Sequence, residues 1–66
     1  MQQYQPHQQR VIEEYAALND KTLALFAFFT NKVFDSLDKD EQELLKMQYH
    51  SMMVYAGILQ KRIAKF

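Results

Sequence analysis

Apolar residues at alternating steps of four and three positions constrain this chain most, because that spacing lays one continuous seam along a helix. Pro6 suits the first turn of a helix, where a missing N–H costs nothing. We therefore expect a helix over about residues 6–30, ending near Asn31, since Asn tolerates the left-handed conformation at a helix end. Its seam consists of Val11, Tyr15, Leu18, Thr22, Leu25 and Phe29.

A second seam predicts a second helix over about residues 39–65. Asp38 is a strong N-cap candidate, with Glu41 three residues further on, close to the capping-box pattern. Gln48 is expected to face Thr22 and form a polar layer that sets the register of the two helices. The predicted second seam consists of Leu45, Gln48, Met52, Tyr55, Leu59, Arg62 and Phe66.

These patterns predict an all-α fold in which residues 1–66 form one helical hairpin domain. The connection, about residues 31–38, is short, so the two helices must lie antiparallel. Val33, Phe34 and Leu37 are expected to form an apolar plug in it. Gly57 costs roughly 1 kcal/mol of helix propensity, and it either admits a close backbone approach or is simply tolerated.

Apolar residues outside the seams predict that the hairpin assembles into a helical-bundle homo-oligomer. Burying each such side chain is worth about 1.5–3 kcal/mol, and a contiguous exposed patch is unusual in a soluble monomer. A few of these residues could instead be exposed singly, which is common. The chain has 66 residues and no Cys, so association is the remaining route to stability. The predicted oligomer interface consists of Phe26, Phe28, Met52, Tyr55, Ile58 and Leu59.

Composition argues against several functional classes. Two histidines far apart in sequence, His7 and His50, and no Cys predict no metal site and no cofactor. The sequence does not suggest a nucleophile with a base and an orienting group that could converge in one pocket. We therefore expect that the protein is not an enzyme. A net charge of zero disfavours nucleic-acid binding. The chain shows no leader and no long apolar run, which predicts a cytoplasmic protein away from membranes.

The zero net charge hides a polarised molecule. No acidic residue follows Glu43, so an antiparallel hairpin gathers His7, Arg10, Lys61, Arg62 and Lys65 at one end. Arg donors suit phosphate, the N-terminus of a helix favours an anion, and flat rings can stack on a base. The candidate ligand-binding residues are Tyr4, His7, Arg10, Tyr15, Lys21, Lys61 and Arg62.

Each candidate also has a purely structural interpretation. Lys61 and Lys65 complement a helix dipole, and Arg10 can pair with Glu13 or Glu14 on its own helix. Tyr15 and Tyr55 suit a core, and Lys21 next to Asp20 suits a solvated surface. Arg62 on the seam is harder to explain structurally, because a buried cation needs a partner.

One set of residues along the chain carries a family resemblance. It consists of the run at 9–14, Leu18, Lys21, Leu25, Phe28, Phe34, Leu37, Leu44, Leu45, Gln48, Met52, Tyr55, Leu59, Arg62 and Ile63. This set resembles a family of short phage proteins related to a crAss-like phage open reading frame. It resembles more loosely the helical hairpin of phage sponge proteins that counter CBASS and Thoeris defence, whose entry is similar to Tyr4-x-Pro6-His7. The resemblance implies an oligomer that sequesters a nucleotide immune signal, such as a cyclic dinucleotide or ADP-ribose derivative, through aromatic and basic groups at subunit interfaces.

The leading hypothesis is therefore a phage anti-defence sponge that binds such a signal in the infected host cell without cleaving it. The alternative is a helical protein–protein interaction module that inhibits a host protein through Met47, Met52 and Met53, since methionine suits adaptable apolar recognition. A third, minor hypothesis is a small nucleic-acid-associated regulator, against which the zero net charge argues.

Overall fold

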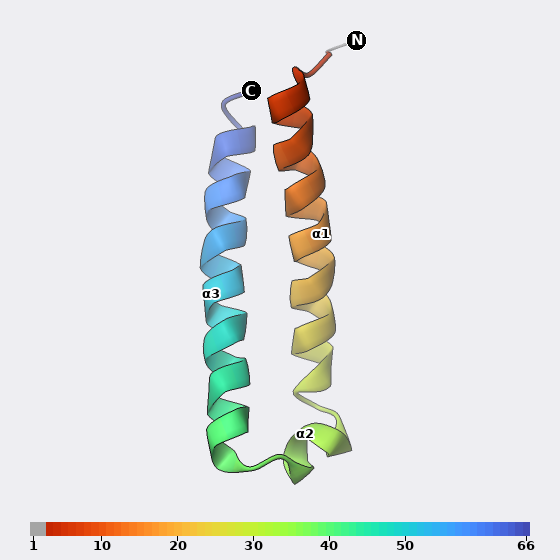
Figure 1. Ribbon diagram of the computed structural model, residues 1–66, viewed down its shortest axis with the longest axis vertical. Coiled ribbons are helices and arrows are strands. Elements are labelled where there is room, and N and C mark those ends of the chain that lie inside the picture. Colours follow the sequence, from red (N-terminus) through yellow and green to blue (C-terminus); the bar gives the residue numbers. More distant parts are fainter. Residues whose placement is uncertain (1–2) are drawn as a thin grey trace.

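The computed structural model describes residues 3–66, and all of its regular structure is helical (Figure 1). Helix α1 spans Pro6–Phe28, the short helix α2 spans Lys32–Ser36, and α3 spans Lys39–Ile63. No strand occurs between residues 3 and 66. The predicted all-α class is confirmed, and the connection, expected to be a plain link, contains a helix of its own.

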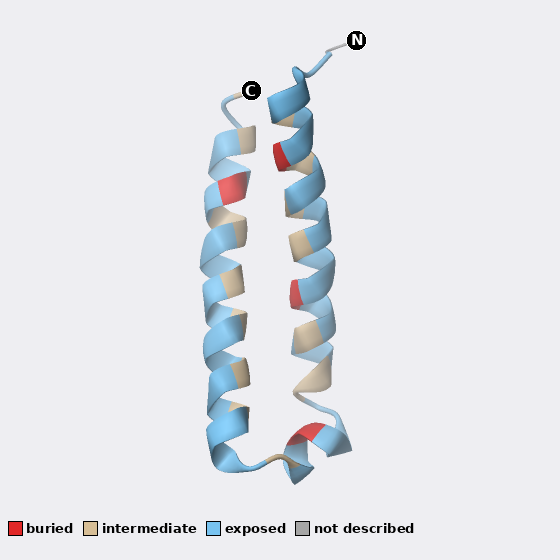
Figure 2. Ribbon diagram, in the orientation of Figure 1, coloured by how far each residue is buried: buried red, intermediate tan, exposed pale blue. Residues whose placement is uncertain are grey.

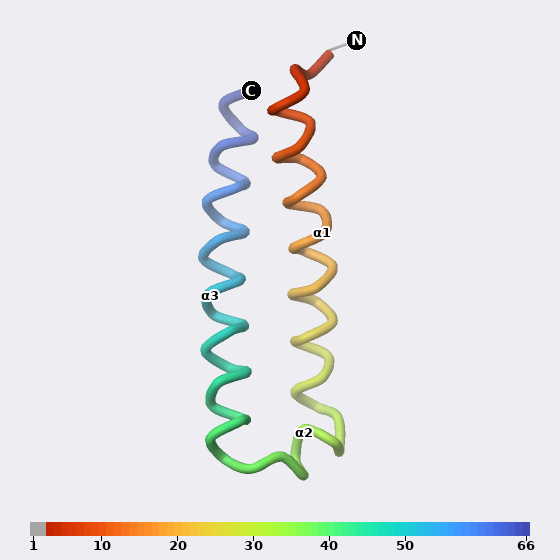
Figure 3. Tube along the Cα trace, viewed as in Figure 1, coloured from red at the N-terminus to blue at the C-terminus, as the bar shows by residue number. Residues whose placement is uncertain are grey.

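The two long helices lie side by side and run in opposite directions, with α2 across one end (Figures 1 and 3). The described chain is a rod of 49 × 16 × 14 Å. At the other end the ring of Tyr4 contacts the ring of Phe66 edge-on, with centroids 6.1 Å apart. The residues before α1 and after α3 therefore meet at one end of the rod.

The inner face of α1 is the seam expected from its spacing. Val11 and Thr22 are buried, and Tyr15, Leu18, Leu25 and Phe29 are half-buried along the edge that faces α3 (Figure 2). The Thr22 hydroxyl donates to the Leu18 carbonyl at 2.7 Å. That bond within the helix is how a polar side chain can be buried there without an unsatisfied hydroxyl.

The seam of α3 differs from the predicted one at alternate positions. Gln48, Tyr55 and Arg62 are exposed. The residues that follow each of them, Tyr49, Ala56 and Ile63, are half-buried instead. The predicted and the observed inner faces of α3 both follow steps of three and four residues. The observed face has less polar side chains in place of the Gln48 amide and the Arg62 guanidinium, and less polar groups cost less free energy to bury. The observed inner face consists of Leu45, Tyr49, Met52, Ala56, Leu59, Ile63 and Phe66.

The expected polar layer between Gln48 and Thr22 is therefore absent. The Gln48 amide nitrogen lies 3.9 Å from the Met52 sulfur on its own helix, and the Thr22 hydroxyl bonds within α1. The register of the hairpin is instead marked by large apolar side chains, foremost Leu59, which is 0% exposed.

Two side-chain caps define the helices of the connection. Asn31 has an extended backbone and accepts the Val33 N–H at 2.8 Å, so it begins α2. The left-handed conformation considered for Asn31 does not occur, since its φ is −83°. Asp38 accepts the Glu41 N–H at 2.8 Å and begins α3, which confirms the predicted N-cap.

Phe34 packs α2 against the end of the hairpin. Its side chain is 6% exposed, and its ring centroid lies 5.9 Å from that of Phe28 and 5.2 Å from that of Phe29. The Gln42 amide of α3 donates to the carbonyls of Phe34 and Leu37, each at 3.0 Å. The Phe34 carbonyl also accepts the Leu37 N–H at 3.1 Å, whereas the Leu37 carbonyl, just past the last turn of α2, has the Gln42 amide as its donor. Val33, expected in the same plug, is 57% exposed.

Candidate ligand-binding and assembly surfaces

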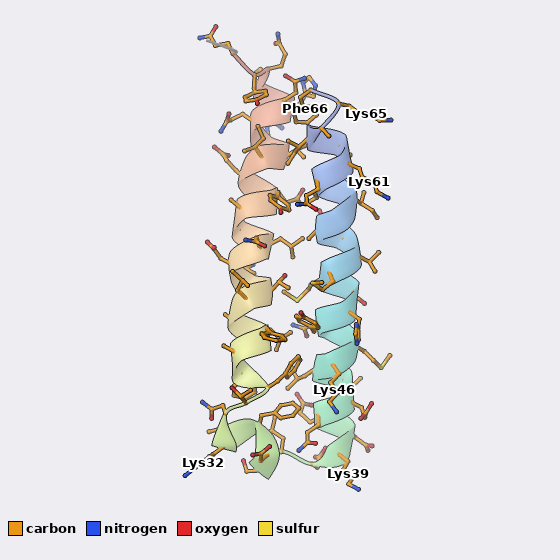
Figure 4. All side chains as sticks on the ribbon, turned by 180° about the vertical axis from the view of Figure 1, so that it is seen from behind. Lys32, Lys39, Lys46, Lys61, Lys65 and Phe66 are labelled. Atoms are coloured by element: carbon orange, nitrogen blue, oxygen red, sulfur yellow. The ribbon has the colours of Figure 1, made fainter. Side chains whose placement is uncertain are left out.

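The end of the rod where Tyr4 meets Phe66 carries a group of exposed basic side chains. His7 and Arg10 lie in the first turns of α1, and Arg62 lies in the last turn of α3; all three are exposed. Lys61 and Lys65 project away from α1 at the same end (Figure 4). Within residues 3–66, Lys46 and Glu43 form the one ion pair, at 3.7 Å. The pairing of Arg10 with Glu13 or Glu14, considered as a structural alternative, is therefore absent from the described chain. We call this end the basic end.

Tyr55 links the two long helices just below the basic end. Its hydroxyl donates to Glu14 Oε1 at 2.5 Å. This hydrogen bond raises the pKa of Tyr55 above its ordinary value of 10.0, desolvation and the negative charge of Glu14 act in the same direction, and the positive charge of Arg62 opposes them. Arg62 thus lies close enough to act on the same hydroxyl, and these three side chains form one cluster.

The Glu14–Tyr55 contact also places His7 relative to Arg62. His7 precedes Glu14 by seven residues and Arg62 follows Tyr55 by seven, and seven residues return a helix to nearly the same face. In an antiparallel pair both steps lead toward the same end. His7 and Arg62 therefore lie on the Glu14–Tyr55 face, one heptad nearer the basic end. Glu14 was missed as a site residue, although flanking positions of antiparallel seams are expected to pair.

Two of the predicted ligand residues lie elsewhere. Tyr15 is half-buried in the seam between the two long helices. Lys21 is exposed but lies eleven residues beyond Arg10, which is roughly 16 Å along a helix. Tyr4 lies at the basic end, but its ring already contacts Phe66. The structure thus gathers Tyr4, His7, Arg10, Lys61 and Arg62 at one end, and leaves Lys21 outside this group.

The residues predicted for the oligomer interface are divided by burial. Phe26, Tyr55 and Ile58 are exposed, and Phe28 and Met52 are half-buried. Leu59 is completely buried inside a single chain, so none of its surface is open to a second copy while the two helices stay packed.

A second apolar stripe runs along the side of α3 that faces away from α1. Its large side chains are Leu44, Met47, Val54 and Ile58, with Val54 the most exposed at 65%. An open hollow of about 370 Å³ lies on this stripe, lined by His50, Ser51, Val54, Tyr55 and Ile58. We call the positions from Leu44 to Ile58 at steps of three and four the outer stripe. The spacing of the outer stripe can be seen in the sequence. The oligomer interface predicted from the sequence nevertheless included only one of its large apolar residues, Ile58.

The described residues contain neither a metal-binding cluster nor a membrane-spanning helix. No group of three or more His, Cys, Asp or Glu side chains between residues 3 and 66 could hold a metal ion. None of the helices described is both long and apolar enough to cross a membrane.

Comparison with known proteins places the chain in a family. The model of the family described as Sequestin matches residues 5–65. The chain belongs to the Sequestin family. The family name denotes sequestration, which points to binding and not to catalysis, and it is not the crAss-like name suggested by the residue pattern.

A phage relative covers almost the whole length of this Sequestin family member. It is an uncharacterized 7.5 kDa protein from the denB–rIIB intergenic region of Enterobacteria phage T4, 47% identical over 60 residues, which are 91% of this chain and 94% of that protein. No solved structure matches the chain. The relative supports the phage origin that the residue pattern implied.

Proposed function

We propose that this Sequestin family member is a phage anti-defence sponge. It binds a nucleotide immune signal, a cyclic dinucleotide or an ADP-ribose derivative, and withholds it from the defence system of the infected bacterial cell without cleaving it. The observation that carries the proposal is the basic end, where His7, Arg10 and Arg62 are exposed and unpaired within the described chain. The name of the family supports the sequestering role.

The groups at the basic end match the parts of a nucleotide. Arg10 and Arg62 offer forked donors that bind phosphate oxygens in pairs, and Lys61 adds a point charge. Tyr4 and His7 offer flat rings for a base. The first turn of α1 contains no acidic residue, so the partial positive charge of the helix N-terminus adds to the attraction.

The shape of the rod favours a pocket shared between copies. A bound small molecule typically loses roughly 70–90% of its surface to its site, and the end of a rod 16 Å by 14 Å across offers one open face. Ends contributed by two or more copies would enclose a nucleotide from several sides. The homo-oligomer is therefore part of the proposal.

Calorimetry against a panel of cyclic dinucleotides and ADP-ribose cyclic isomers tests this function. Arg10→Ala and Arg62→Ala should each weaken binding at least about tenfold, because a hydrogen bond to a charged group is worth about 1.5–3 kcal/mol. Lys32→Ala is the matched control, because Lys32 lies at the opposite end of the rod (Figure 4). Chromatography of the ligand released by denaturation should return it intact. Binding to no panel member, or a cleaved product, would contradict the proposal.

A second candidate function rests on the exposed methionines. Met47 is 61% exposed and Met53 is 50% exposed, whereas Met52 is half-buried in the seam. A module that inhibits a host protein would use the two exposed methionines as adaptable contacts. This function predicts that Met47→Ser abolishes capture of one defined host protein and leaves nucleotide binding unchanged.

A further inference from the structure

The outer stripe of α3 is chemically symmetric about its centre. With one charged residue added at each end, it keeps the alternating steps of four and three throughout. From Ser51 outward, Met47 corresponds to Val54, Leu44 to Ile58, and Asp40 to Lys61, with opposite charges at the last pair. The extended stripe consists of Asp40, Leu44, Met47, Ser51, Val54, Ile58 and Lys61.

We infer that the outer stripe is the contact between two copies of this chain, with the two α3 helices antiparallel about a two-fold axis at Ser51. A two-fold contact uses the same patch on both copies, so the patch must be complementary to itself. The symmetry of the stripe provides that complementarity, with Leu44 of each copy against Ile58 of the other. The inference rests on the self-association proposed above and is independent of the ligand.

Charge selects the antiparallel orientation. In that orientation Asp40 of each copy faces Lys61 of the other, so two opposite-charge contacts form. A parallel pair would place Asp40 against Asp40 and Lys61 against Lys61, and like charges at helix contacts are unfavourable. Neither residue has an ion-pair partner within the described part of its own chain, so both are available to a second copy.

The hollow on α3 lies at the centre of this contact. It is lined by Ser51, Val54 and Ile58 among others, and Ser51 is the smallest side chain of the stripe. Packed helices insert side chains of one into such gaps of the other, and a small central residue allows the two backbones to approach. The same contact removes Val54, the most exposed large apolar side chain, from water.

The pairing also divides the cations between two roles. Lys61 belongs to both the contact and the basic end, whereas Arg10 and Arg62 lie outside the contact and remain free for phosphate. Substitutions of Leu44 or Ile58 in the outer stripe and of Arg10 or Arg62 at the basic end therefore report on different events. Failure of nucleotide binding with the dimer intact counts against the proposed function alone.

Charge reversal measured by sedimentation equilibrium tests the orientation. Asp40→Lys alone and Lys61→Asp alone should each weaken self-association about tenfold, because two attractive contacts become repulsive. The double variant Asp40→Lys/Lys61→Asp should restore it. Asp20→Lys on α1 makes the same charge change at an exposed position outside the stripe and should have little effect. Single variants that match the parent, or a double variant no better than either single one, would overturn the antiparallel contact.

Cross-linking tests the position of the two-fold axis. The chain has no Cys, so Ser51→Cys introduces the only thiol, and oxidation should give a covalent dimer at low protein concentration. Met53→Cys is the control, since Met53 is also exposed and lies off the stripe. A Ser51→Cys variant that cross-links no faster than Met53→Cys would overturn the inference, as would a parent chain that remains a single copy.

Discussion

At the residue scale, the bond from Tyr55 to Glu14 is the one side-chain hydrogen bond recorded between α1 and α3 across the described chain. It joins residues 41 positions apart and lies beside Arg62, a candidate phosphate ligand. A directional contact at this point fixes how the two helices present the basic end. The same hydroxyl is affected by both a carboxylate and a guanidinium.

Tyr55→Phe should therefore lower the stability of the hairpin toward urea. Glu14 raises the pKa of Tyr55 above 10.0 in the folded chain, so the stabilisation is complete below the unfolded pKa of 10.0 and disappears as pH rises through the folded value. The parent and the variant should differ at neutral pH and converge in strong alkali.

Tyr15→Phe is the matched control, because no hydrogen bond is recorded for the Tyr15 hydroxyl within the described chain. It should unfold like the parent protein at neutral pH. A difference between Tyr55→Phe and the parent that persists unchanged in strong alkali would show that the hydroxyl acts through something other than its bond to Glu14.

At the element scale, α2 depends on a single aromatic anchor. Phe34→Ala should reduce the free energy of unfolding by about 3 kcal/mol, because it empties a site between the rings of Phe28 and Phe29. Val33→Ala in the same short helix should change it by less than about 0.5 kcal/mol, since Val33 lies on the surface. Urea titrations followed by circular dichroism measure both, and equal effects would contradict the anchoring role.

The glycine of α3 makes a separate prediction. A Cβ at Gly57 would meet nothing within 4 Å, so within one chain no close approach requires glycine there. Gly57→Ala should then stabilise the helix by roughly 0.5–1 kcal/mol. A variant that is less stable, or that associates less, would show that a second copy packs on Gly57 and that the outer stripe is not the whole interface.

The inner face of a helix could be predicted from the sequence where only one set of apolar residues follows the helical spacing. In α1 a single series exists, and the structure places it toward α3, with Val11 and Thr22 buried and the other members half-buried. In α3 two series share Leu45, Met52 and Leu59, so spacing alone leaves the choice at alternate positions open. The structure favours Tyr49 over Gln48 because burying an unpaired amide is costly. The helix within the connection was missed because its cap, Asn31, was interpreted as a stop.

The sequence was sufficient to predict which charged residues gather at the basic end, but not which side chains contact one another there. Antiparallel helices necessarily bring Arg10 and Arg62 to one end, so composition along the chain was sufficient for the basic end. The contact of Tyr4 with Phe66 and that of Tyr55 with Glu14 depend on the rotation of α3 about its axis. Because the sequence analysis placed the wrong alternate positions of α3 on its inner face, it could not predict these two contacts.

At the scale of the whole molecule, a rod 49 Å long has a single seam of buried side chains and a second apolar stripe left on its outer side. A lone hairpin of this size gains little from burial, and the outer stripe would remain in water. Two copies joined along α3 would cover it and place one basic end at each extremity of the pair. A pocket shared between basic ends then forms where the end of one pair meets the end of another.

Native mass spectrometry of the protein purified from phage-infected cells measures assembly and cargo together. We predict masses at even multiples of the 7.9 kDa chain, each with additional mass corresponding to bound nucleotide that denaturation releases intact. A population made up of the 7.9 kDa chain alone, without bound small molecule at any concentration tested, would contradict sequestration by an assembled hairpin.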